Sequence, residues 1–133
     1  MPRYGRDDSE WDLLVHAGLT FLVDRARLGR VTSYTELNTT LSNRTHARTF
    51  DFERADERAA MGELLGLIVE RNRPETGLMI SALVHYLGEN DAGPGFYVFA
   101  QDLGLLAKNA SQDDKLTFWV EQVSALHRYY ARP

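Results

Sequence analysis

The chain contains no cysteine. This absence excludes disulfides, thiol nucleophiles, cysteine-ligated zinc and iron–sulfur clusters. The sequence also has no apolar run near the roughly 20 residues that a membrane-spanning helix needs. Residues 1–8 have none of the apolar character of a signal peptide. We therefore expect a cytoplasmic protein that does not enter a membrane.

Positive charge is also scarce, since the formal net charge is −4 and the only lysines are Lys108 and Lys115. A molecule of this charge is not drawn to nucleic acid as a whole. Its arginines are nevertheless suited to planar, bidentate contacts with phosphate or carboxylate. A length of 133 residues, of which 44% are hydrophobic, is typical of one globular domain. We expect a single domain over residues 1–133, with residues 1–8 flexible.

Apolar periodicity and capping residues predict five helices. Their expected ranges are Glu10 to Leu28, Ser33 through Leu41, Asp56 to the break at Asn72–Gly77, Phe96 to Leu103, and Ser111 through Tyr130. The first is opened by Ser9 and Asp12 and ends at Gly29, and the polar stretch 42–54 is expected to be a loop.

The run Leu78–Leu87 is apolar almost throughout and lies between two glycines, which predicts a buried strand. With the helices, it indicates a mainly α (α+β) fold. We expect a winged-helix-like domain with an N-terminal helix, a short β element and a long C-terminal helix.

No constellation in the sequence indicates catalysis or metal binding. None of the four histidines has the spacing of a zinc site. Ser81 and His85 would lie about 13 Å apart on a strand, too far to act as a nucleophile and its base. We therefore expect no catalytic residue, no metal and no cofactor.

Three segments, taken in order, carry a resemblance: Gly29–Leu37, Arg58–Gly66 and Met79–Val84. They resemble the winged-helix DNA-binding domain of alkylguanine-DNA alkyltransferases and alkyltransferase-like proteins. Ser81–Val84 and Gly93–Phe96 also resemble small uncharacterised bacterial proteins with a Ser-Ala-Leu-Val … Gly-x-Gly-Phe pattern.

The resemblance implies DNA binding without alkyl transfer. Ser81 begins the stretch that replaces the cysteine nucleophile motif, so a thiolate acceptor is absent. Ala59 stands where that family has its finger arginine, and Arg58 lies one position earlier. Tyr34 matches a tyrosine that helps to rotate the target nucleotide in that family.

We therefore expect a non-enzymatic, winged-helix-like nucleic-acid-binding module whose partner is duplex DNA. Its expected contact residues are Tyr34, Arg44, Arg48, Arg54 and Arg58. The alternative is a protein–protein interaction module, or a homodimer, that retains the fold without DNA binding. Acidic residues interleaved with these arginines favour the alternative, because they cancel the positive charge.

Overall fold

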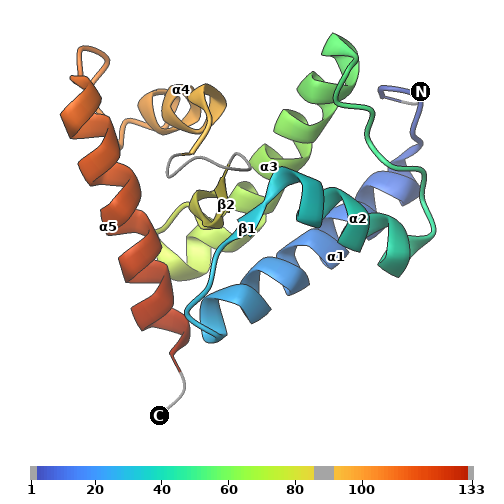
Figure 1. Cartoon of the computed structure of the whole chain (residues 1–133), viewed down its shortest axis with the longest axis horizontal. Coiled ribbons are helices and arrows are strands. Elements are labelled where there is room, and N and C mark those ends of the chain that lie inside the picture. The colour runs from blue at the N-terminus through green and yellow to red at the C-terminus, as the bar shows by residue number, and fades with distance from the viewer. Residues whose placement is uncertain (1–2, 86–91, 132–133) are drawn as a thin grey trace.

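The computed structural model describes residues 3–85 and 92–131 (Figure 1). Within these residues five α-helices, one 3₁₀ helix and two short strands follow one another. They are α1 (Asp8–Arg27), β1 (Thr32–Ser33), α2 (Tyr34–Thr45), α3 (Ala55–Thr76), η1 (Ile80–Leu83), β2 (Val84–His85), α4 (Pro94–Asp102) and α5 (Gln112–Tyr130). The predicted mainly helical fold with a small β element is confirmed.

Helix α1 begins two residues earlier than expected, because the capping residue is Asp7 and not Ser9. The Asp7 carboxylate accepts a hydrogen bond from the N–H of Glu10 at 2.9 Å. The buried face of α1 includes Trp11, Leu14 and Leu22, and it packs against α2, α3, α5 and η1. Helix α1 therefore lies at the centre of the helical packing.

Helix α2 opens at the predicted cap, where the Ser33 hydroxyl accepts a hydrogen bond from the N–H of Glu36 at 3.1 Å. It runs one turn further than predicted and ends at His46, whose φ of 62° is left-handed. The expected loop over 42–54 therefore begins at His46. This connection is longer than the roughly three- to four-residue turn of a helix-turn-helix motif.

Helix α3 begins at Ala55, after Arg54, so Asp56 lies in its first turn and is not the cap. The helix continues through Pro74 to Thr76 and ends at Gly77, with a φ of 71°. Pro74 is tolerated because it lies in the last turn, where only one backbone bond is lost before the helix ends.

The prediction of one buried strand over Leu78–Leu87 is wrong. Ile80–Leu83 form the 3₁₀ helix η1, and only Val84 and His85 pair with β1, in parallel register. Residues 86 and 87 lie outside the described residues. The apolar run reflects burial on all sides, because η1 is surrounded by α1, α3 and α5. Within the described residues, the β element is this parallel pair and not a hairpin.

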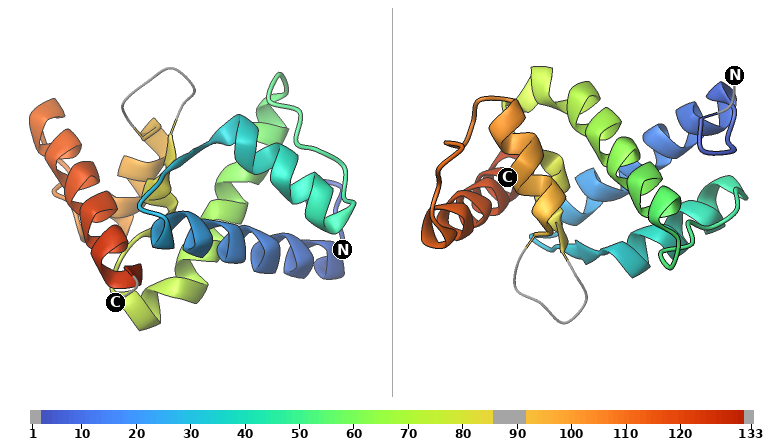
Figure 2. Two further views of the ribbon diagram at one scale, coloured as in Figure 1. Left: turned by 60° about the horizontal axis from the view of Figure 1, so that its bottom comes forward. Right: turned by 90° about the horizontal axis from the view of Figure 1, so that it is seen from above.

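Helices α4 and α5 close the fold on one side (Figure 2). Ser111 and Asp114 form the predicted capping box at the start of α5. Trp119, half-buried, donates its indole N–H to the carbonyl oxygen of Ala82 at 2.8 Å and so fixes η1. Phe96 of α4 packs on Phe118 of α5, with ring centroids 5.8 Å apart.

Candidate functional site

The predicted arginines are engaged within the molecule. Arg54 forms a bidentate pair with Asp56, at 3.1 and 2.7 Å. Arg58 donates to the carbonyl oxygen of Phe52 at 2.7 Å. These two arginines, at the start of α3, are exposed. The acid paired with Arg54 cancels its charge, whereas Arg58 keeps its charge because its partner is neutral.

The other two predicted arginines make contacts elsewhere. Arg44 lies over the ring of Phe21, with its guanidinium carbon 5.4 Å from the ring centroid. Arg48 donates to Glu57 at 2.8 Å and to the carbonyl oxygen of Tyr4 at 3.0 Å. The structure therefore does not bring the four arginines together into one unpaired basic surface.

Glu57 is the centre of a buried charge network. Arg6, which is fully buried, donates to both of its oxygens at 3.0 and 3.3 Å and stacks on Phe50. The pKa of Glu57 is lowered to about 2, chiefly by the hydrogen bond from Arg6 and also by the N–H of Asp51, the charge of Arg6 and the hydrogen bond from Arg48, against the opposing effect of burial. This network ties the N-terminal segment to α3. The flexibility expected of residues 1–8 stays a prediction, and residues 1–2 lie outside the described residues.

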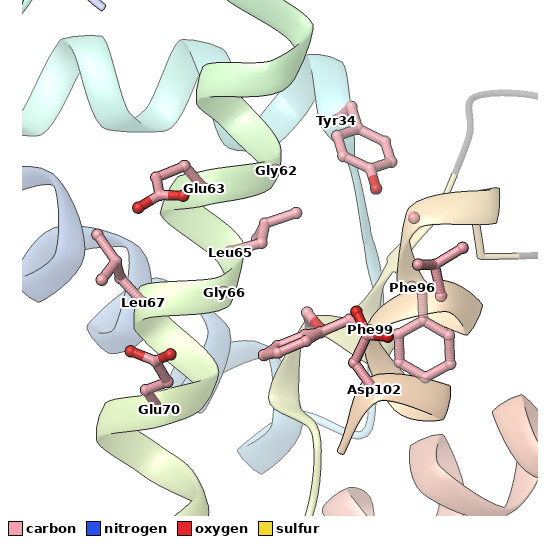
Figure 3. A pocket seen from close by; sticks show the side chains of 13 residues that line it. Tyr34, Gly62, Glu63, Leu65, Gly66, Leu67, Glu70, Phe96, Phe99 and Asp102 are labelled. Atoms are coloured by element: carbon pink, nitrogen blue, oxygen red, sulfur yellow. The ribbon is translucent and has the colours of Figure 1, made fainter. Parts of the chain in front are cut away.

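The four predicted arginines are not gathered around Tyr34. Its ring meets Phe52 edge-on, with centroids 6.3 Å apart, and its other side lines a pocket between α3 and α4. Figure 3 shows its hydroxyl pointing toward that space.

The pocket has a volume of about 490 Å³. Its walls are mainly apolar and come from α3 and α4, with Tyr34 at one end (Figure 3). The lining residues are Tyr34, Gly62, Glu63, Leu65, Gly66, Leu67, Glu70, Ser81, Gly95, Phe96, Val98, Phe99 and Asp102. A hollow of this size with a few polar groups is typical of a binding site.

Ser81 brings a polar group to this apolar pocket. The residue is only 6% exposed, and its hydroxyl has no hydrogen-bond partner in the described part of the chain. It is accordingly not paired with His85. Because the residue lines the pocket, a ligand bound there can form a hydrogen bond with the Ser81 hydroxyl.

Two glycines leave the α3 side of the pocket bare. Gly62 and Gly66 lie four residues apart, on the side of α3 that faces α4 (Figure 3). A Cβ at Gly62 would have nothing within 4 Å, and one at Gly66 would lie 4.0 Å from the Phe99 ring. Packing therefore does not require glycine at either position, and the pocket is deeper because of them.

We expect Gly62→Ala and Gly66→Ala each to raise the free energy of unfolding by about 0.5–1 kcal/mol, because alanine favours a helix. Gly18→Ala should instead destabilise, since its Cβ would lie 2.7 Å from Cδ1 of Ile68. Urea denaturation of the three variants measures this difference. Equal losses at all three positions would show that Gly62 and Gly66 are needed for packing.

Within the described part of the chain, the charged side chains that line the pocket are carboxylates. Glu63 pairs with Arg3 at 2.9 Å, while Glu70 and Asp102 form no ion pair within the described residues. Glu63 and Glu70 lie along the outer edge of α3, and Asp102 lies on α4 (Figure 3). Among the described residues, no arginine or lysine lines the pocket. The carboxylates of Glu70 and Asp102, which lack ion-pair partners there, favour a cation over a phosphate at this place.

The pocket was missed at the sequence level, although one signal was present. Gly62 and Gly66 at a spacing of four fall on one helix face, which indicates a bare strip. Metal chemistry has no support from the arrangement: residues 3–85 and 92–131 contain no group of three His, Asp or Glu side chains placed to hold an ion. None of the helices in these ranges has the length and apolar character to cross a membrane.

Comparisons with protein-family models, with curated proteins and with solved structures find no match to this chain.

Proposed function

We propose that this is a cytoplasmic, non-enzymatic protein-interaction module that binds a segment of a partner protein in the pocket between α3 and α4. One observation carries the proposal: an open, mainly apolar hollow in which the charged lining groups, among the residues that the structure describes, are carboxylates. Burial of apolar side chains drives most protein association. An acidic border disfavours the phosphates of a nucleic acid at the same place.

The state of the arginines supports the same conclusion. Arg48 and Arg54 have their charge compensated by Glu57 and Asp56. Arg44 is stacked on Phe21. A DNA contact by these side chains would have to replace bonds they already make, so the gain in affinity would be small.

A selection from a random peptide library tests the proposal, with the protein immobilised. We expect the wild-type chain to enrich a peptide motif and Gly66→Leu to lose it, because leucine there extends toward Phe99 and fills the pocket. Gly66→Ala is the matched control and should keep the motif. A motif enriched equally by the Leu variant would place binding elsewhere and contradict the proposal.

Duplex DNA binding is the second candidate, and one observation favours it. Tyr34 and Ser81, which stand at the two positions that define the site in the alkyltransferase resemblance, line the same pocket. If the resemblance holds, this chain would bind DNA with Tyr34 next to the duplex. Its arginines within residues 44–58 would then contact the phosphates.

If this candidate holds, the log of the affinity should fall with the log of the salt concentration with a slope of roughly −2 to −4. Arg58→Ala should make that slope shallower by about one, because Arg58 keeps its charge. Arg54→Ala is the control, and we expect it to change the slope less because Asp56 already compensates that arginine. Fluorescence anisotropy with labelled duplexes measures both. No binding by micromolar protein at low salt would end the nucleic-acid interpretation.

A further inference from the structure

We infer that the partner segment places a tryptophan or tyrosine ring in the pocket between α3 and α4, with lysine or arginine beside it. This inference rests on the proposed function and specifies the chemistry of the partner. Three features support it independently: the shape of the pocket, the Ser81 hydroxyl and the carboxylates at the pocket.

The shape suits a flat ring. At Gly62 the backbone of α3 is open, with nothing within 4 Å of where a Cβ would be, and the Phe99 ring of α4 reaches within 4.0 Å of that position at Gly66 (Figure 3). Aromatic rings pack well edge-on against other rings and bury a large area with little loss of conformational freedom. The volume of about 490 Å³ leaves room for the ring and part of a neighbouring side chain.

The Ser81 hydroxyl favours a partner side chain that carries a hydrogen-bond donor over a purely apolar one. Ser81 is 6% exposed, it lines the pocket, and its hydroxyl has no partner among the described residues. A leucine or phenylalanine anchor would cover this hydroxyl and remove its access to water without giving it a hydrogen bond. A tryptophan N–H or a tyrosine O–H gives it a hydrogen bond, and buried rings with such a polar end dominate many interfaces.

The carboxylates at the pocket determine which partner residues are favoured next to the aromatic ring. Glu70 and Asp102 lack ion-pair partners in the part of the chain that the structure describes, and they lie on opposite sides of the pocket. A lysine or arginine next to the ring would reach one of them without entering the apolar interior. Acidic neighbours would be repelled, so charge determines which aromatic segments bind.

The experiment uses three labelled twelve-residue peptides that differ only at the centre: a tryptophan flanked by arginines, a tryptophan flanked by glutamates, and an alanine flanked by arginines. We expect the first to bind at least about tenfold more tightly than either of the others. Its advantage over the glutamate peptide should shrink as salt rises. Fluorescence anisotropy measures all three against the wild-type chain, and Gly66→Leu should remove binding of the first.

A double-mutant cycle tests the contact with Ser81. Replacing the tryptophan of the first peptide by 1-methyltryptophan removes the N–H, and should weaken binding to the wild-type chain about fivefold. In Ser81→Ala the same replacement should have no effect. Ser81→Ala is expected to fold normally, because its hydroxyl forms no bond within the described chain, and a thermal melt checks this.

The possible failures are distinct. Equal binding of the arginine- and glutamate-flanked tryptophans, both lost in Gly66→Leu, overturns the charge selection and leaves the proposed function standing. Equal binding of the alanine peptide overturns the aromatic anchor. If library selection also yields no peptide that depends on the pocket, the proposed function fails along with the inference.

Discussion

Val84→Asp is expected to destabilise the fold by more than about 4 kcal/mol, which approaches the whole stability of many domains. Val84 is 1% exposed and pairs with Thr32 in the parallel β element next to η1. A carboxylate there would be buried without a partner. Thermal and urea denaturation, followed by circular dichroism, measure the loss.

Val120→Asp provides the control, since Val120 is 50% exposed on α5. The same chemical change there should alter the free energy of unfolding by no more than about 0.5 kcal/mol. Similar melting of both variants and the wild-type chain would remove Val84 from the core and contradict the fold around η1.

Glu57→Gln is expected to cost about 3 kcal/mol at neutral pH, because it removes the carboxylate that accepts hydrogen bonds from the buried Arg6 and leaves only Glu10, 3.8 Å away, to balance its charge. Glu63→Gln, on the same helix, is the control. Glu63 is 41% exposed and pairs only with Arg3, so its loss should cost less than about 1 kcal/mol. Equal effects of the two substitutions would show that the buried network contributes little.

The same network makes stability depend on pH. The pKa of Glu57 is about 2 in the folded chain, against 4.5 for an ordinary glutamate. Its contribution is therefore fully present above pH of about 5 and is lost as the pH falls toward 2, because the unfolded chain takes up the proton first. Urea denaturation at several pH values should show a shallower decline over this range in Glu57→Gln than in the wild-type chain.

Features that depend on neighbouring residues were predicted best from the sequence. The caps at Ser33 and Ser111 are confirmed, and each capping hydrogen bond joins residues three apart. The caps predicted at Ser9 and Asp56 are wrong, since Asp7 caps α1 and α3 begins after Arg54. A shift of one or two residues at a helix boundary changes little in free energy.

The error over Leu78–Leu87 has a physical cause. The spacing of apolar residues shows which face of a segment is buried. A segment that is buried on every side is apolar throughout and therefore has no such periodicity. Ile80, Ala82 and Leu83 are all buried, and η1 contacts α1 and α5, which are distant in sequence, as well as the neighbouring α3. The apolar composition was therefore compatible with a 3₁₀ turn as well as with a strand.

The candidate site was only partly predictable. Tyr34 was chosen from the sequence and lines the pocket, yet Phe99 reaches the same pocket from α4. The buried pair of Arg6 and Glu57 was not predicted, because its two residues are 51 positions apart. Side-chain pairing over such distances leaves no local pattern.

The most direct test of the pocket as a protein-binding surface is a ¹H–¹⁵N NMR titration of the assigned chain with the arginine-flanked tryptophan peptide and, separately, with duplex DNA. We expect the peptide to shift the amide signals of Gly62, Gly66 and Phe99, which border the pocket. DNA should shift them little. Peptide shifts confined to residues 44–58, or DNA shifts centred on the pocket while the peptide has no effect, would contradict the proposed function.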